Sequence, residues 1–243
     1  MSRFGQEERM TRAETLNDSV MATIPPLESG DHLSRHEFER RYDAMPDLKK
    51  AELIEGIVYL GSPVGLRAHG RPNAHAMAWI GNYHAQTSGT ITAGHASVRL
   101  DPANEFQPDT LLMIDPARGG QASLSDDDFI EGAPELVFEV AASKASIDLN
   151  AKLRVYQRNN VREYLVWRVL DRAIDWFVLV EGAYQRLEPA ADGILRSTVF
   201  PGLWLDRDAL VGASLAKVLE VLQQGIADPG HADFVARLNR TTS

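Results

Sequence analysis

The segment PELVFEVAA, residues 134–142, carries a glutamate, Glu139, in the middle of an apolar run. Its β-branched and aromatic residues and its short length predict a buried strand. A carboxylate within such a strand is costly unless it is paired or binds a metal ion. Because side chains alternate along a strand, Glu139 shares one face with Val137, and Phe138 shares the other with Val140. Glu139 then either pairs with an arginine or faces solvent, or it belongs to a functional site.

A second carboxylate opens the strand that precedes this one. Residues 107–114 (QPDTLLMI) predict a strand, and Asp109 lies at its start, directly after a proline. Two carboxylates on otherwise apolar strands are the most informative residues of the sequence, because each needs a compensating charge or ligand once it is buried.

A helix is expected after residues 134–142, over about 149–159, with Asp148 as its N-cap. Spacing of three and four residues puts Lys152 and Tyr156 on the same helix face as two leucines. Lys152 therefore lies on, or at the border of, the inward face. A solvated surface lysine and a tyrosine that only packs in the core are the alternatives.

The remaining elements follow from similar local signals. Ser34 and Glu37 have capping-box spacing, so a helix is expected from Ser34 to about Met45. Gly56 divides residues 51–60 into a hairpin or a bulged strand. The other expected elements are a loop at 61–73, a helix at 74–87 capped by Asn73, strands at 90–100, 163–169, 174–180 and 184–187, and a helix at 208–222.

This order of elements predicts one α/β domain with a central mixed β-sheet flanked by helices. We expect a flexible leader at residues 1–30, the domain at residues 31–225, and a polar tail at residues 226–243 with at most a short helix at 232–238. Trp167 and Trp176, on the later strands, are expected in the core or a dimer interface rather than as base-stacking residues.

Composition limits the classes of function. Of the 243 residues, 44% are hydrophobic and 24% charged, as in a typical globular protein. The net charge of −9 argues against a general nucleic-acid coat protein, whose affinity comes from lysines and arginines. The absence of cysteine excludes disulfides and thiol nucleophiles. No membrane-length apolar run and no secretory signal is present, so we expect a cytoplasmic protein without membrane contact.

Several short stretches, taken in order, point to a known family. They are ELIEG at 52–56, SP at 62–63, His69, QPD at 107–109, PELVFEV at 134–140, the spacing of Asp148, Lys152 and Tyr156, VREYLVW at 161–167 and FPGL at 200–203. Together they resemble the Uma-two family of the PD-(D/E)XK nuclease superfamily, over about residues 33–210. The resemblance implies a restriction-endonuclease-like core.

The resemblance also implies roles for individual residues. Asp109 and Glu139 would hold a divalent cation, Mg²⁺ with Mn²⁺ as a substitute, and Glu52 would complete the metal site directly or through water. The metal would lower the pKa of a bound water and stabilise charge on the scissile phosphate. Lys152 would orient the attacking water and offset the charge of the phosphate.

The sequence departs from the superfamily pattern at one position. That pattern places a lysine two residues after Glu139, where this chain has Ala141. The resemblance implies that Lys152 replaces it, and Lys144 on the intervening loop is the competing candidate. Four basic residues near the start of the second helix are expected to contact phosphate or to lie near the metal, unless loop 61–73 is simply a polar surface. They are Arg67, His69, Arg71 and His75, of which His69 matches the family's position.

Three functions stay open. The first is a Mg²⁺-dependent endonuclease that hydrolyses phosphodiester bonds in DNA, for which a homodimer would suit the cutting of two strands. The second is a catalytically inactive nucleic-acid- or protein-binding relative, which the acidic balance and Ala141 favour. The third is a metal-dependent hydrolase of another phosphate ester. No base-reading motif is visible, so the sequence predicts no target sequence.

Overall fold

The central sheet of this computed structural model, which describes residues 24–142 and 147–240, has the strand order β12-β11-β10-β9-β6-β3. Within it, β9 and β10 run parallel and the other neighbours pair antiparallel. The expected mixed sheet is therefore confirmed. Its strands are β3 (Thr90–Ala93), β6 (Thr110–Ile114), β9 (Leu136–Ala141), β10 (Glu163–Arg168), β11 (Ala173–Val180) and β12 (Ala183–Arg186).

A second six-stranded sheet, which the sequence did not predict, has the order β2-β1-β5-β4-β8-β7. Residues 90–100, expected as one strand, are divided between the two sheets by a bend at 94–97. The unpredicted strands have only two or three residues each, too few to show an alternating pattern. The strands are β1 (Ala51–Ile54), β2 (Ile57–Leu60), β4 (Val98–Asp101), β5 (Asn104–Phe106), β7 (Ser123–Leu124) and β8 (Ile130–Glu131), with a separate ribbon of β13 (Ile194–Arg196) and β14 (Trp204–Asp206).

Strands β1 and β2 form the expected hairpin. Glu55 and Gly56 occupy its two-residue turn with φ of 53° and 77°, the left-handed backbone that a type I′ turn requires. Most of the predicted leader, residues 1–23, lies outside the described residues. The described part of the predicted leader, residues 24–30, is packed against the domain, because Leu27 is buried against Phe38 and Val58.

The N-terminal helices begin where their local chemistry allows. In α2 (Arg35–Asp43), the Ser34 hydroxyl accepts a hydrogen bond from the Glu37 N–H, as predicted. The Asn73 cap is wrong: α3 (Arg71–Ala85) starts earlier, directly after a π-helical turn, η1 (Leu66–Gly70), within the expected loop. Pro72 sits in the first turn of α3, where its missing N–H costs nothing.

The helix after β9 also begins differently from what was predicted. A π-helical turn, η3 (Asp148–Lys152), leads directly into α5 (Leu153–Arg158). Asp148 lies inside this turn, and its side chain caps no backbone N–H there. The predicted N-cap is therefore wrong, and the Asp148 carboxylate is directed to another partner, described below. A single 3₁₀ turn, η2 (Pro116–Arg118), follows β6.

The C-terminal region is more structured than predicted. The helix expected at 208–222 is divided into α6 (Arg207–Val211) and α7 (Leu215–Ile226) by Gly212 and by Ala213, whose φ is 59°. The predicted polar tail contains α8 (Pro229–Arg240), which buries Phe234 and Leu238 in the main core. Among the described residues, no helix is long and apolar enough to cross a membrane.

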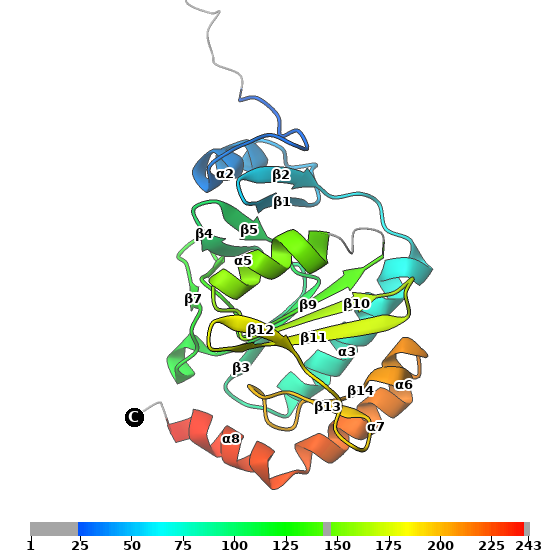
Figure 1. The fold of residues 1–243 in the computed structure, drawn as a ribbon. Helices are drawn as coiled ribbons and strands as arrows, with labels where there is room; N and C mark the ends of the chain where they lie inside the picture. Colours follow the sequence, from blue (N-terminus) through cyan, green and yellow to red (C-terminus); the bar gives the residue numbers. More distant parts are fainter. Residues whose placement is uncertain (1–23, 143–146, 241–243) are drawn as a thin grey trace, which may run out of the picture.

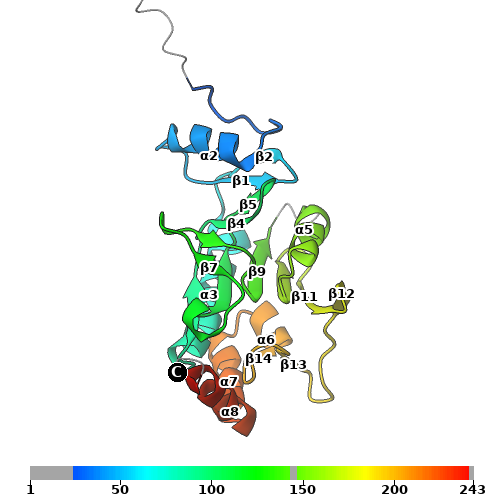
Figure 2. The ribbon, with the colours of Figure 1, turned by 90° about the vertical axis from the view of Figure 1, so that its left-hand side faces the viewer.

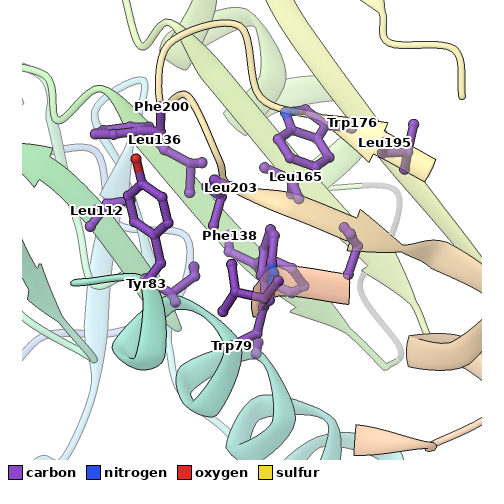
Figure 3. Close-up of a cluster of buried hydrophobic side chains, with 14 of the residues drawn as sticks. Trp79, Tyr83, Leu112, Leu136, Phe138, Leu165, Trp176, Leu195, Phe200 and Leu203 are labelled. Carbon is purple, nitrogen blue, oxygen red and sulfur yellow. The ribbon is translucent and has the colours of Figure 1, made fainter. Parts of the chain in front are cut away.

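The two faces of the central sheet have separate cores. Residues of α3, α7 and the loop before β14 pack on the face that carries Phe138 and Val140, around Trp79, Tyr83 and Trp176 (Figure 3). Helix α5 packs on the opposite face, which carries Val137. The predicted alternation along β9 is thus confirmed, and Glu139 points to the α5 face.

The FPGL stretch allows α7 to approach this core closely. Gly202 has φ of 87°, and a Cβ added there would lie 2.7 Å from the Gly225 carbonyl oxygen. Both views show α2 and the β1–β2 hairpin at one end of the molecule and α7 and α8 at the other (Figure 1, Figure 2). In Figure 2, α3 and α5 flank β9 on opposite sides.

Candidate functional site

The register of the central sheet brings the two strand carboxylates together. Strands β6 and β9 pair antiparallel with Thr110 opposite Phe138, so one step further places Asp109 beside Glu139. Asp109 Oδ2 accepts a hydrogen bond of 2.8 Å from the Val140 N–H. Both side chains are almost fully buried. The proline before Asp109 and the strand pattern around Glu139 thus place both carboxylates at one end of the sheet.

Lys152 lies among three carboxylates. Its Nζ is 2.8 Å from Glu139 Oε1, 3.1 Å from Glu52 Oε1 and 3.6 Å from Asp148 Oδ1. The side chain is only 4% exposed, so the solvated surface lysine is wrong. Glu52 comes from β1 of the second sheet and Glu139 from the central sheet. Lys152 therefore joins the two sheets at this point.

Two further predicted residues hold the strand carboxylates in place. The Tyr156 hydroxyl, one helical turn after Lys152, donates to Glu139 Oε1 at 3.2 Å. The His69 ring nitrogen Nε2 lies 3.1 Å from Asp109 Oδ2. Tyr156 also packs in the core, between Phe106 and Tyr164. It therefore contacts the site and contributes to the core at the same time.

The charged residues of the site and His69, but not Tyr156, line a cavity of about 170 Å³. Four carboxylates face two lysines and His69 there, so acidic groups outnumber the ammonium groups. Lys50, which the sequence analysis missed, lies 3.8 Å from Glu52 and donates to the Gln107 carbonyl at 2.8 Å. Lys50 and Glu52 are two residues apart, which puts them on one face of a strand. This spacing was the signal in the sequence that could have identified Lys50. The spacing of four between Asp148 and Lys152 was likewise the available signal for their contact, although Asp148 was interpreted as an N-cap.

The pKa values of Glu139 and Lys152 are both raised, for different reasons. Burial, with Asp109, Asp148 and Glu52 nearby, raises the pKa of Glu139 to about 7 despite the Lys152 ammonium. Burial disfavours the charged form of Lys152, but Glu139, Glu52 and Asp148 outweigh it and hold its pKa well above the ordinary value.

Asp109 behaves differently from Glu139. Burial alone would raise the pKa of Asp109, but the hydrogen bond from His69, the Lys50 charge and the Val140 N–H hold it below the ordinary value. The same hydrogen bond raises the pKa of His69. Asp109 is therefore an ionised carboxylate, and its other oxygen, Oδ1, is buried without a hydrogen-bond partner among the described residues.

The donor set suits a hard divalent cation that keeps part of its water shell. Within residues 24–142 and 147–240, no three histidine or carboxylate side chains are gathered closely enough to form a full cage. Mg²⁺ needs none, since it is usually held by one or two carboxylates, with water and substrate phosphate completing the shell. Asp109 with its unbound Oδ1, beside Glu139, fits that requirement. Glu52 is nearby, with Oε1 bound by Lys152 and the Gln107 N–H.

Other predicted residues lie elsewhere. Arg71 is outside this cavity and lines a second one. Lys144, the competing lysine, lies outside the described residues. Trp167 and Trp176 are core residues. His95, which was not singled out, reaches within 3.9 Å of Asp109 Oδ1 with its Nδ1; it comes from the bend between β3 and β4, which carried no recognisable signal.

Comparison with known proteins identifies the family of the chain. No curated protein matches the chain. Among solved structures, a protein from Anabaena variabilis ATCC 29413, described as a “putative nuclease belonging to DUF820”, is 12% identical, with a TM-score of 0.49 over 71% of this chain and 97% of that one. Residues 35–208 match the Uma2 family, described as “Putative restriction endonuclease”. Because this match spans most of the chain, the protein belongs to the Uma2 family of restriction-endonuclease-like proteins.

Proposed function

We propose that this protein is a Mg²⁺-dependent endonuclease that hydrolyses phosphodiester bonds in DNA. Family membership supports a nuclease in general. One observation carries the finer proposal: a buried, ionised Asp109 keeps one oxygen without a hydrogen bond, beside Glu139 and Lys152 in an acidic cavity. An unbound anionic oxygen at such a position is costly unless a cation binds it.

Asp109 and Glu139 would hold the cation. A bound Mg²⁺ supplies a water of lowered pKa and stabilises charge on the scissile phosphate. His69 and the Val140 N–H fix Asp109 Oδ2, and Tyr156 fixes Glu139 Oε1. Holding both carboxylates in position before substrate arrives reduces the reorganisation that catalysis requires.

Lys152 would serve as the cation that the protein itself supplies. Its three carboxylate neighbours keep its Nζ protonated, so it presents a fixed positive charge rather than acting as a base. A compact ammonium of this kind offsets the charge of a phosphate and orients a water molecule through its N–H groups. Lys152 would thus replace the lysine that the superfamily pattern places two residues after Glu139, where this chain has Ala141.

Cleavage of plasmid and short duplex DNA, with Mg²⁺, Mn²⁺ or EDTA, tests the proposal. We expect cleavage with either metal, none with EDTA, and loss of cleavage in Asp109→Asn. The matched control is Asp192→Asn, an exposed aspartate paired with Arg196 far from the cavity, which should cleave normally. Cleavage by Asp109→Asn at the wild-type rate would overturn the mechanism.

A catalytically inactive, nucleic-acid- or protein-binding relative is the second candidate. It is favoured by the hydrogen bonds that already engage Glu52 and Glu139 without any metal. Thermal stability under Mn²⁺ and Mg²⁺ titration separates the two candidates, since a ligand that binds the native state raises stability by mass action. Saturable stabilisation that is lost in Asp109→Ala/Glu139→Ala favours the enzyme. No stabilisation, with metal alone or with a short duplex added, favours the inactive relative.

A further inference from the structure

A second cavity, of about 120 Å³, has the opposite charge from the carboxylate pocket. Arg67, Arg71, His75 and Arg172 line it, over an apolar floor that includes Trp167 and Val169, and no carboxylate takes part. The two cavities share no lining residue. In a chain with a net charge of −9, a cavity lined only by cationic and apolar groups is an exception.

The basic residues come from separate parts of the chain. Arg67 lies on η1, Arg71 and His75 lie one turn apart on α3, and Arg172 lies in the turn between β10 and β11. Apolar residues at the end of α6 and just after it complete the lining. Figure 1 shows the start of α3, the β10–β11 turn and α6 along the same side of the molecule.

Several exposed arginines elsewhere in the molecule are paired with acidic residues. Arg40 is bound to Glu37, Arg154 to Glu55 and Arg196 to Asp192. In contrast, none of the three arginines of this cavity has an ion-pair partner within residues 24–142 and 147–240. Even Asp171, next to Arg172 in sequence, is bound to Arg168 instead.

His75 adds a further unsatisfied group. Its Nδ1 is buried, and no described residue forms a hydrogen bond with it. Burial, together with the Arg71 cation, lowers the pKa of His75, as expected in a region that is already electropositive. Three guanidinium groups without partners and a ring nitrogen without a hydrogen bond converge on one small volume. Arginine donors in this arrangement suit the oxygens of a phosphate group.

We propose that this second cavity binds a backbone phosphate of the same nucleic-acid strand that is hydrolysed in the carboxylate pocket. The link between the two cavities is η1: His69 lines the carboxylate pocket, and Arg67, two residues earlier, lines the basic cavity. A polyanionic strand can occupy both cavities at once, whereas a small phosphate compound would fill only one. This inference rests on the proposed function, and it explains how an acidic protein holds an acidic substrate.

Binding of nucleic acid without metal tests the inference separately from catalysis. Fluorescence anisotropy of a short labelled duplex DNA, and of its single strand, is measured in EDTA over a range of salt concentrations. The test variant is Arg67→Gln/Arg71→Gln/Arg172→Gln. The matched control, Arg40→Gln/Arg154→Gln/Arg196→Gln, removes the same charge from exposed, paired arginines. Thermal unfolding confirms that both variants are folded.

We expect the test variant to bind at least about tenfold more weakly at low salt. The slope of log Kd against log salt should fall by about one, because the cavity neutralises one phosphate of the strand. The control variant should bind like the wild type.

Equal binding and equal slopes in all three proteins overturn the inference, even if the wild type cleaves DNA. Absence of binding by the wild type overturns it as well. Stabilisation of the wild type, but not the test variant, by inorganic phosphate or a mononucleotide, with unchanged oligonucleotide binding, would show a small-anion site instead. Failure of cleavage with intact, arginine-dependent binding would refute the proposed function alone.

Discussion

Two charge clusters in this molecule have similar compositions but differ in how their carboxylates are neutralised. Lys152 lies among Glu52, Glu139 and Asp148, whereas Arg99 on β4 lies among carboxylates from α2, β5, β8 and the loop before β8. Arg99 is 2.8 Å from Glu39, 2.9 Å from Asp127, 3.3 Å from Glu131 and 3.9 Å from Glu105, and it also lies 4.0 Å over the Phe129 ring.

Buried carboxylate oxygens without a hydrogen-bond partner among the described residues lie at both clusters. They are Glu39 Oε1 and Glu105 Oε2 in the Arg99 cluster, and Asp109 Oδ1, beside Glu139, at the Lys152 cluster. Burial and the neighbouring Glu39 carboxylate raise the pKa of Glu105 to about 8, so at neutral pH a proton neutralises it. Asp109 instead stays ionised, with its pKa held below the ordinary value against its burial by His69, Lys50 and the Val140 N–H.

The difference separates a cluster that needs no further ligand from one that can bind a cation. A carboxyl group that takes up a proton needs no further ligand, and the Arg99 cluster holds α2 against the second sheet. An ionised carboxylate that opens on a cavity retains the capacity to bind a cation. A count of acidic residues would not have distinguished the two clusters, because both surround one base with several carboxylates.

Removal of Arg99 should have the largest effect on stability. Arg99→Met leaves Glu39, Asp127 and Glu131 without their shared cation, and the loss of hydrogen bonds between charged groups costs about 1.5–3 kcal/mol. Urea denaturation measures this loss. Arg154→Met, which removes an exposed arginine paired with Glu55, should cost no more than about 1 kcal/mol. Equal losses in the two variants would mean that the Arg99 cluster does not stabilise the fold.

Substitution of Glu139 should separate activity from stability. Glu139→Gln keeps the shape and an oxygen for Lys152 and Tyr156 but removes a ligand of the proposed cation. We expect cleavage to fall at least about 100-fold, near 2.7 kcal/mol of activation free energy. Because burial makes the ionised form of Glu139 costly, the free energy of unfolding should stay equal or rise. A marked loss of stability would assign Glu139 to the fold instead.

The smallest expected effect is on the pH dependence of stability. Glu105 has a raised pKa in the folded state, so it stabilises the fold at low pH, and this contribution is lost as the pH rises through about 8. Between pH 7 and pH 8 the wild type should lose about 1 kcal/mol that Glu105→Gln does not lose. Urea denaturation of both proteins at several pH values measures the difference. Parallel pH profiles would show that Glu105 is already ionised.

Most residues of the candidate site were identified from the sequence, because the patterns that pointed to them were local or depended on the order of motifs. Asp109 and Glu139 stood out as carboxylates in apolar strands, and helical spacing put Lys152 and Tyr156 on one face. Asp148 was singled out as an N-cap, although its partner is Lys152. Lys50 and His95 were missed, since their positions depend on how β1 and the bend after β3 meet the central sheet.

The sequence by itself determined the mixed central sheet, the alternation along β9, the Ser34 cap and the β1–β2 hairpin. Each depends on neighbours a few residues apart, where steric and hydrogen-bonding preferences act directly. The tertiary structure alone decided the second sheet of short strands, the packing of α8 and the convergence of Arg67, Arg71 and Arg172. These features depend on pairing and packing between distant segments, whose energies become apparent only when the chain is folded and its charges are desolvated together.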